Sequence, residues 1–379
     1  MRKLNKRASR VKIDRVELIH IELPLVHFFE TSFGRTYSRS IVLVKVYGDG
    51  LVGYGECVAG KAPLYSYETT ETCWYVLKEF LVPLVLNNEL AGASVVYDML
   101  VSIRGHRMAK AALENACWDL EAKLRGVPLF RFLGGERLTI SSGVSLGIED
   151  SPDELLTRVE HYLSLGYRRI KVKIKPGWDT DMLSALRRSF PEAPLMVDAN
   201  GAYTLEDIDT LKRLDDYHLM MIEQPLHYED LADHARLQSQ LQTPLCLDES
   251  ITSSRQGERA IELGSCRIIN IKQGRVGGLS QAKLLHDICL ANRIPVWCGG
   301  MLESGIGRAH NIALSTLKNF TLPGDISASD RYYKEDIIDP PVTVDRNGNI
   351  TVPTEPGIGF LPNQRRIDRI TTRREVITG

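Results

Sequence analysis

The sequence predicts an α/β barrel preceded by a smaller α+β domain. Its 379 residues allow about two to three domains, and 43% of them are hydrophobic, enough for a substantial core. From about residue 138, short apolar segments alternate with amphipathic windows roughly every 25 residues. Nearly eight such units favour a closed barrel, because parallel strands need helical crossovers. A doubly wound open sheet is disfavoured because no Gly-x-Gly-x-x-Gly follows the first strand.

The first 135 residues have the pattern of an α+β unit. Val11–Leu25 and Ile41–Val46 are rich in Val, Ile and Leu, which predicts strands. Tyr47–Gly50 is a turn sequence that leads into Leu51–Cys57, so we expect a hairpin. Met108–Arg125 keeps apolar residues three to four apart, which predicts a helix that ends at the following glycine and proline.

The remaining chain divides into the barrel and a tail. We expect barrel strands at 140–146, 169–174, 194–198, 219–222, 244–247, 267–271 and 294–298, with a weaker one near 320–324. Helical windows between them include Pro152–Leu165, Thr204–Leu214 and Leu279–Ala291. After about Arg331 the periodicity is lost, and we expect this tail to fold back onto the first domain. The predicted division is therefore 1–135, 136–330 and 331–379.

Composition excludes several classes of protein. The chain has 47 Lys and Arg against 48 Asp and Glu, which gives no electrostatic footprint for nucleic acid. The longest apolar run, Phe80–Leu86, is far shorter than the roughly 18 residues of a membrane span. Met1–Arg10 is basic, but no apolar segment follows it, so it does not resemble a secretory signal. Seven scattered cysteines without a Cys-x-x-Cys pair suit reduced thiols, so we expect a cytoplasmic protein.

Five charged residues stand at the ends of five consecutive predicted strands. They are Lys173, Asp198, Glu223, Asp248 and Lys272, separated by 25, 25, 25 and 24 residues. The carboxyl ends of barrel strands converge on one mouth, where active sites of such barrels lie. A structural ion-pair network is the alternative for any one of these residues, but it does not explain a charge at the same phase of every repeat.

The order of these charges indicates a chemistry. Three neighbouring carboxylates repel one another unless a cation lies among them, and Mg²⁺ prefers oxygen ligands whereas zinc prefers His or Cys. Such a metal stabilises the anion formed when a carbon next to a carboxylate loses its proton. A flanking lysine can remove that proton only if its pKa falls from about 10.4 toward 7–8. Lys171 points the same way as Lys173 and favours this shift.

Longer motifs surround these residues and extend over nearly the whole chain. They are Pro24–Val26, Thr31–Gly34, Ala112–Leu120, Ile170–Asp179, Val197–Asn200, Ile222–Pro225, Leu247–Ser250, Asn270–Gly278, Trp297–Gly305 and Leu322–Asp330. With them the chain resembles the enolase superfamily, in its muconate lactonising enzyme subgroup. Within that subgroup it is similar to the o-succinylbenzoate synthase/N-succinylamino acid racemase family.

The resemblance implies a modified (β/α)7β barrel, similar to a TIM barrel, beneath an α+β capping domain that the C-terminal segment completes. It implies Asp198, Glu223 and Asp248 as ligands of Mg²⁺, for which Mn²⁺ is a substitute. Lys173 and Lys272 are the implied acid/base pair. The implied partner is a small carboxylate substrate, and the implied assembly is a homo-oligomer.

The implied activity is that of a Mg²⁺-dependent lyase in menaquinone biosynthesis, an o-succinylbenzoate synthase. Lys173 would remove the α-proton of 2-succinyl-6-hydroxy-2,4-cyclohexadiene-1-carboxylate, and the hydroxyl would then leave. Lys272, as ammonium, would help to stabilise the enediolate. The same residues imply N-succinylamino acid racemase activity, in which one lysine removes the α-proton and the other returns a proton on the opposite face.

The resemblance also assigns surrounding residues. It implies substrate contacts or support of the metal site by Lys171, Ser145, Asn200, Gly300, Met301 and Leu302, with Glu249 and Arg275 behind them. Arg275 matches a position where racemising members carry Arg, and its charge would lower the pKa of Lys272. Phe28–Tyr37 resembles a mobile specificity loop over the mouth.

Some features leave alternatives open. Members usually read Lys-Pro-Gly-Arg where this chain has Gln273, which restores a backbone N–H and changes the geometry expected between Lys272 and Arg275. Dipeptide epimerase and muconate cycloisomerase share the same core, but epimerases carry Asp-x-Asp where this chain has Asp325–Ser327. A non-catalytic barrel with a structural metal predicts a missing lysine or ligand, and none is missing.

Overall fold

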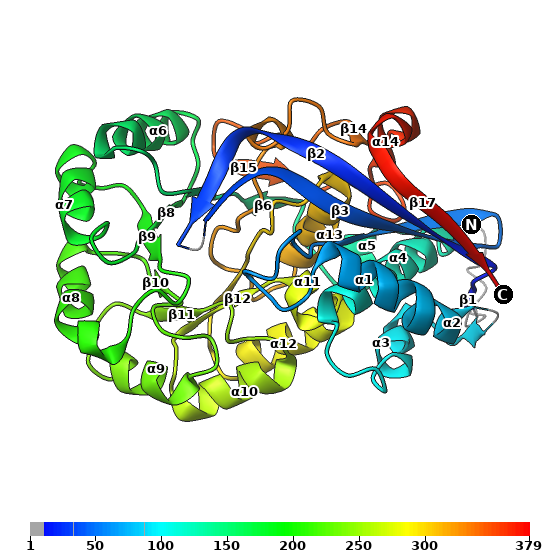
Figure 1. The fold of residues 1–379 in the computed structure, drawn as a ribbon, viewed down its shortest axis with the longest axis horizontal. Helices are drawn as coiled ribbons and strands as arrows, with labels where there is room; N and C mark the ends of the chain where they lie inside the picture. Colours follow the sequence, from blue (N-terminus) through cyan, green and yellow to red (C-terminus); the bar gives the residue numbers. More distant parts are fainter. Residues whose placement is uncertain (1–10, 33, 87) are drawn as a thin grey trace.

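The computed structural model describes residues 11–32, 34–86 and 88–379, so the basic stretch 1–10 lies outside the described residues. The chain forms an antiparallel sheet with its helices and, beside it, a curved parallel sheet with helices around its outer side (Figure 1). Within these ranges, no helix combines the length and the apolar character that a membrane span needs.

The four-stranded antiparallel sheet is the centre of the capping domain. Its strands follow the order β17 (Thr371–Thr378), β2 (Arg15–Thr31), β3 (Gly34–Gly48) and β4 (Leu51–Cys57). Gly48 pairs with Leu51, so the expected hairpin is confirmed. The segment 28–37, expected as a loop, is instead the far end of the β2–β3 hairpin, where Phe29 pairs with Thr36 and Thr31 with Gly34. Position 33, within it, is outside the described residues.

Helix α4 (Arg107–Leu124) lies directly on β4 because two glycines leave room for it. A Cβ on Gly53 would stand 2.0 Å from the carbonyl oxygen of Ala116. A Cβ on Gly55 would stand 2.0 Å from the carbonyl oxygen of Ala112. Small residues on both surfaces therefore bring the helix backbone onto the sheet, and this helix confirms the one expected at 108–125.

The barrel sheet is parallel throughout and follows the order of the sequence. Its seven strands are β7 (Val144–Leu146), β8 (Ile170–Lys173), β9 (Leu195–Asp198), β10 (Ile222–Glu223), β11 (Leu245–Leu247), β12 (Ile268–Ile271) and β13 (Val296–Cys298). The first expected strand, 140–146, is split: β6 (Thr139–Ser141) pairs with β15 (Asn349–Thr351), and only β7 joins the barrel.

No regular strand forms near 320–324, where the weaker one was expected. This segment instead makes isolated bridges, from Phe320 to Val296 and from Gly324 to Ser142. The backbone N–H of Asp325 donates to the carbonyl of Cys298 (2.8 Å), and that of Gly143 donates to the carbonyl of Gly324 (2.7 Å). The segment thus connects the last strand to the first and closes the barrel without extended pairing.

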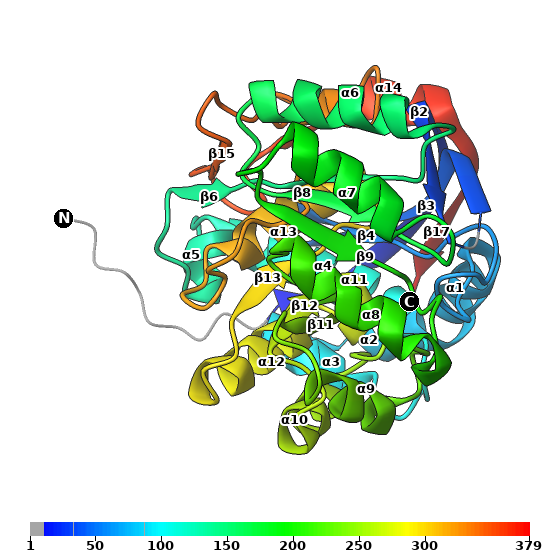
Figure 2. The ribbon, with the colours of Figure 1, turned by 90° about the vertical axis from the view of Figure 1, so that its left-hand side faces the viewer.

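Helices follow the strands around the outside, and Figure 2 faces several of them. They are α6 (Pro152–Ser164), α7 (Thr180–Ser189), α8 (Ile208–Arg213), α9 (Leu231–Gln238), α10 (Ser254–Leu263), α12 (Leu279–Ala291) and α13 (Gly305–Ser315). Side chains of Ser151, Asp230 and Ser253 accept hydrogen bonds from backbone N–H groups and so begin their helices. The helix expected from Thr204 begins as a 3-10 turn and becomes α-helical at Ile208.

The C-terminal segment returns to the capping domain, where β17 pairs with β2. The domain boundaries at 135 and 330 stay a prediction. The remaining elements are β1 (Val11–Lys12), α1 (Thr70–Val76), α2 (Val82–Val85), β5 (Glu89–Leu90), α3 (Val96–Met99), α5 (Leu129–Leu133), α11 (Gln273–Val276), β14 (Ile338–Asp339), β16 (Leu361–Pro362) and α14 (Gln364–Ile370).

Candidate active site

The five charged residues expected at strand ends lie at the same end of the barrel. The parallel register places Lys173 opposite Asp198 and Asp198 opposite Glu223. Asp248 and Lys272 come directly after β11 and β12, and the Lys272 Nζ lies 2.8 Å from Asp248 Oδ2. All five side chains are buried, so their charges interact with little screening from solvent.

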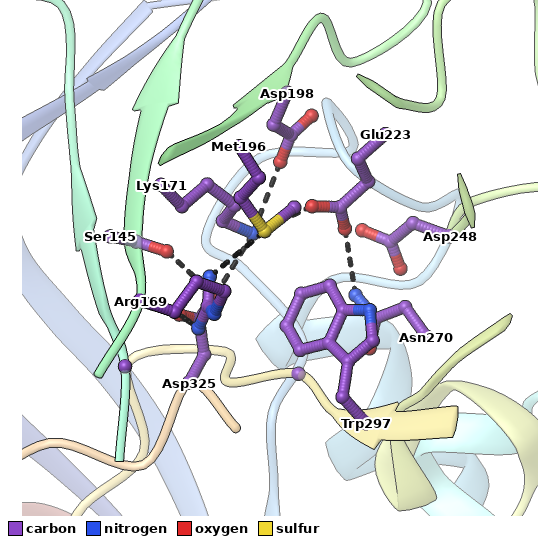
Figure 3. A network of polar contacts seen from close by, with 12 residues as sticks. Ser145, Arg169, Lys171, Met196, Asp198, Glu223, Asp248, Asn270, Trp297 and Asp325 are labelled. Carbon is purple, nitrogen blue, oxygen red and sulfur yellow. Dashed lines mark hydrogen bonds and ion pairs between the residues drawn. The ribbon is translucent and has the colours of Figure 1, made fainter. Parts of the chain in front are cut away.

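Lys171 stands at the centre of this mouth (Figure 3). Its Nζ lies 3.0 Å from Glu223 Oε2 and 3.2 Å from Asp198 Oδ2. It also lies 2.9 Å from Asp325 Oδ2. Burial alone would lower the pKa of Lys171, but Asp325, Glu223 and Asp198 outweigh burial and raise it. Lys171 is therefore a firmly charged ammonium.

Lys173 lies on one flank, where the hydrogen-bond partners that the structure describes for it belong to the barrel. Its Nζ donates to Asp198 Oδ2 and to Asn200 Oδ1, both at 2.6 Å. Asn200 has a positive φ of 46°, and its Nδ2 donates to Glu249 Oε1 at 2.7 Å. The strained turn after β9 therefore positions Asn200 between the lysine and Glu249.

Lys272 is held on the opposite flank with help from the capping domain. Its Nζ donates to the Tyr65 hydroxyl at 3.2 Å and lies 4.6 Å from the centre of the Tyr65 ring. Tyr65 in turn donates to Asp248 Oδ1 at 3.0 Å. Burial opposes the charge of Lys272, but Tyr65, Glu249 and Glu223 raise its pKa above the ordinary value.

Arg275 is buried beside this flank, and its guanidinium has other partners than Lys272. It pairs with Asp248, and its Nε donates to the carbonyl of Ile251 at 2.6 Å. Its Nη2 donates to the carbonyl of Asn270, also at 2.6 Å. The side chain of Gln273 contacts the capping domain instead, where its Oε1 accepts a hydrogen bond from Asn115 of helix α4 at 2.6 Å.

The carboxylates differ in how well their charge is balanced. Burial would raise the pKa of Asp198, but Lys173 and Lys171 lower it well below its usual range. Burial raises the pKa of Glu223, and the charge of Asp198 adds to this shift. Burial and Asp198 likewise raise the pKa of Glu249. Burial therefore disfavours the charge of Glu223 and Glu249, whereas the charge of Asp198 is stabilised by its two lysine neighbours.

A divalent cation suits this donor set. Within the described ranges, no group of three or more His, Cys, Asp or Glu side chains has the arrangement of a metal site. The carboxylates of the mouth contact lysine and arginine groups instead. Glu249 Oε2, however, is buried and has no hydrogen-bond partner among the described residues. A buried carboxylate oxygen without a partner at this end of the barrel fits a hard cation with oxygen ligands.

A cavity of about 130 Å³ opens beside the lysines of this mouth. Its lining includes all the expected substrate contacts, together with Phe29, Thr31 and Thr36 from the β2–β3 hairpin. The expected contacts are Lys171, Ser145, Asn200, Gly300, Met301 and Leu302. Both Lys173 and Lys272 line it as well, so the barrel end and the capping hairpin enclose one space.

The backbone after β13 passes very close to this cavity. A Cβ on Gly299 would stand 2.7 Å from Lys272 Cε, and one on Gly300 would stand 2.5 Å from the carbonyl oxygen of Asp325. Only glycines fit these two positions without displacing their neighbours. The N–H of Met301 donates to Glu303 Oε2 at 2.9 Å, which fixes the segment that follows.

Tyr65, Asp325 and Arg169 were not expected in the site. Tyr65 comes from the irregular segment between β4 and α1, where no periodicity points to a role. Asp325 follows a segment without a regular strand. Arg169 lies before β8, and a lone Arg before a strand gives no functional signal, although it pairs with Asp325 in the structure.

Comparison with known proteins agrees with this architecture. Residues 15–134 match the family described as mandelate racemase / muconate lactonizing enzyme, N-terminal domain, and residues 154–366 match the enolase C-terminal domain-like family. A curated o-succinylbenzoate synthase of Geobacillus kaustophilus is 54% identical, over 95% of this chain and 96% of that protein. An N-succinylamino acid racemase of Thermus thermophilus is 47% identical, over 95% of this chain and 98% of that protein.

A solved structure supports the same assignment. The crystal structure of an enolase superfamily member from Listeria innocua superposes with a TM-score of 0.94 at 42% identity, covering 97% of this chain and 99% of that one. Both domains, the barrel with its charged mouth and the capping sheet, therefore have family counterparts. The chain belongs to the enolase superfamily, in its mandelate racemase/muconate lactonizing enzyme family, among the o-succinylbenzoate synthases and N-succinylamino acid racemases.

Proposed function

We propose that this protein is an o-succinylbenzoate synthase that also racemises N-succinylamino acids. The observation that carries the proposal is that Lys173 and Lys272 line one cavity from opposite flanks, beside a buried set of carboxylates. The identities of 54% and 47% to a synthase and a racemase, each over nearly the whole chain, support both activities. A role in menaquinone biosynthesis follows from the synthase half.

Lys173 is the proposed base in the dehydration. Its amine removes the proton from the substrate carbon next to the carboxylate, after which the ring hydroxyl leaves as water by taking that proton from the Lys173 ammonium, and the ring becomes aromatic. Lys272 stays protonated and stabilises the negative charge that develops, and its raised pKa suits this role. For racemisation, Lys272 returns a proton to the face opposite the one from which Lys173 removes it.

Asp198, Glu223 and Asp248 are the proposed ligands of a divalent cation, Mg²⁺ or in its place Mn²⁺. Bound there, the cation stabilises the charge that develops on the substrate carboxylate when the neighbouring carbon loses its proton. Asn200 supports this site through its contacts with Lys173 and Glu249. Enolase superfamily enzymes of this family generally use such a metal, and the oxygen donors agree with that use.

Other residues that line the cavity are proposed to hold the substrate. Lys171 meets the carboxylate next to the reacting carbon, since it is a buried ammonium that lines the cavity. Ser145 and the segment Gly300, Met301 and Leu302 contact the succinyl chain. The hairpin residues Phe29, Thr31 and Thr36 cover the cavity and exclude water.

A side-by-side assay tests the proposal. Purified protein with Mg²⁺ is given the cyclohexadiene carboxylate, several N-succinylamino acids and, as a comparison, an L-Ala-L-Glu dipeptide. We expect turnover of the first two classes and none of the dipeptide, because Asp325 is already paired with Lys171 and Arg169 and position 327 is serine. Turnover of the dipeptide alone would contradict the proposal.

We further propose that the enzyme is cytoplasmic and forms a homo-oligomer. Its seven cysteines are all free and buried, which suits a reducing compartment. Exposed aromatic side chains on the capping domain, such as Tyr75 and Phe80, offer surface for a second copy. Sedimentation of the purified protein measures the assembly, and a purely monomeric species would contradict it.

A further inference from the structure

Asp325 joins two residues proposed to hold the substrate. Its Oδ2 accepts a hydrogen bond from Ser145 Oγ at 2.6 Å and lies 2.9 Å from Lys171 Nζ (Figure 3). Its Oδ1 pairs with Arg169. Both oxygens are therefore occupied, and one of them fixes two groups that face the cavity.

Arg169 is anchored by groups behind the mouth. It is fully buried, and its Nε donates to the carbonyl of Pro323 at 3.0 Å. Its guanidinium carbon lies 4.7 Å from the centre of the Trp297 ring, and the Lys171 Nζ lies 5.0 Å from the same ring. Pairing with a rigid, always charged partner fixes the orientation of the Asp325 carboxylate.

Lys171 has three carboxylate neighbours, and Asp325 differs from the other two. Asp198 and Glu223 are proposed metal ligands, at 3.2 and 3.0 Å from the Lys171 Nζ, whereas Asp325 is not. Without the charge of Asp325, the attraction on Lys171 would come from Asp198 and Glu223 alone. The ammonium would then move toward those two residues and away from the Ser145 side of the cavity.

We propose that Asp325, itself oriented by Arg169, is a positioning residue that holds the Lys171 ammonium and the Ser145 hydroxyl in place for the substrate carboxylate. Asp325 thereby prevents the Lys171 ammonium from moving closer to Asp198 and Glu223. The substrate and its contact with Lys171 rest on the proposed function, whereas the contacts of Asp325 with Lys171 and Ser145 do not.

Asp325→Asn tests this role because it keeps the shape of the side chain and removes its charge. We expect the KM for either substrate class to rise about tenfold to a hundredfold, as for a lost charged hydrogen bond, while kcat changes much less. Asp119→Asn is the matched control. Asp119 is also fully buried and its Oδ2 lies 2.6 Å from Lys123 Nζ, but it belongs to the capping helix α4. We expect the control to keep the wild-type KM.

Gly143→Ala disturbs the same network from behind without altering any group that faces the substrate. The added methyl would lie 2.5 Å from Arg169 Nη2 and 2.7 Å from its Cζ, so the guanidinium must move. We expect a smaller rise in KM in the same direction. If Asp325→Asn does not fold, the KM of Gly143→Ala tests the positioning role of Asp325 in its place.

A double-mutant cycle separates positioning from general destabilisation. If Asp325 acts through Ser145, the effects of Ser145→Ala and Asp325→Asn on KM will be less than additive. Additive effects of the two substitutions, or a wild-type KM in both Asp325→Asn and Gly143→Ala, would overturn the inference.

Calorimetric binding of succinate in the presence of Mg²⁺ gives a readout independent of turnover. If the wild type turns over neither substrate class, yet Asp325→Asn weakens succinate binding and Asp119→Asn does not, the proposed function fails and the positioning stands. If the wild type is active and Asp325→Asn binds succinate as tightly as the wild type does, the proposed function stands and the positioning fails.

Discussion

The two flanks of the mouth hold their lysines in different ways. Among the described residues, the polar partners of Lys173 are the barrel residues Asp198 and Asn200, both within three residues of the end of β9. Lys272 contacts Asp248 from the barrel and Tyr65 from the capping domain. One flank is thus complete within the barrel, whereas the other is assembled from two parts of the chain.

This difference suits two chemical tasks. An amine base becomes charged when it removes a proton, and on the Lys173 flank the oxygens of Asp198 and Asn200 stabilise the ammonium that forms. An ammonium that stabilises charge benefits from a fixed environment, which the Tyr65 ring and hydroxyl provide for Lys272. The comparison therefore predicts that changes on the two flanks will affect the two activities unequally.

The largest effect is expected from the lysines themselves. Lys173→Ala should lower synthase turnover by about 10²–10⁴-fold, the usual contribution of a general base, and abolish α-proton exchange on its side. Lys272→Ala should abolish racemisation while exchange at the Lys173 face persists. Proton exchange in D₂O followed by NMR measures both. Wild-type exchange in Lys173→Ala would refute the assignment of the base.

Removal of the metal should stop the reactions that depend on either lysine. Chelation with EDTA is expected to stop synthase and racemase turnover reversibly, because both need the charge on the substrate carboxylate to be stabilised. Activity restored by Mg²⁺ or Mn²⁺ completes the test. A rate that persists without metal would remove the case for Asp198, Glu223 and Asp248 as ligands.

A pair of milder substitutions compares the flanks directly. Tyr65→Phe removes the hydroxyl that contacts Lys272 and Asp248, and we expect racemisation to fall about tenfold or more. Asn200→Ala removes a contact of Lys173 and should lower both activities by a similar factor. Rates of the two reactions in each variant measure the contrast, and equal losses in Tyr65→Phe would show that the flanks are equivalent.

The smallest effect concerns the contact between the capping sheet and the barrel. Glu56 on β4 is buried and accepts hydrogen bonds from the N–H groups of Ser304 (3.0 Å) and Gly307 (2.9 Å) at the start of α13. Burial raises the pKa of Glu56 from 4.5 to about 7. Its contribution to stability is therefore full below about pH 4.5 and is lost as the pH rises through about 7.

Urea unfolding between pH 5 and pH 8 measures this contribution. We expect the wild type to lose about 1–3 kcal/mol of unfolding free energy from this group over that range. Glu56→Gln cannot ionise, so its unfolding free energy should fall less steeply with pH. The same slope in both proteins would show that Glu56 is already ionised in the folded state.

The sequence predicts the barrel and its charges because both follow one repeat. In a parallel sheet, residues that are one strand–helix repeat apart lie side by side on adjacent strands. Lys173, Asp198 and Glu223 are therefore lateral neighbours. Tyr65 was not predictable, because its position depends on how a capping segment docks onto the barrel. The same is true of Asp325, since its segment closes the barrel through isolated bridges and carries no strand pattern.

The pairing of β17 with β2 has a consequence for synthesis on the ribosome. Strand β2 is synthesised early but pairs with β17, so the capping sheet cannot be completed until the ribosome has made residues 371–378. The seven barrel strands pair in sequence order and require no such delay. A nascent chain would therefore be able to form its barrel sheet first and would complete its capping sheet later.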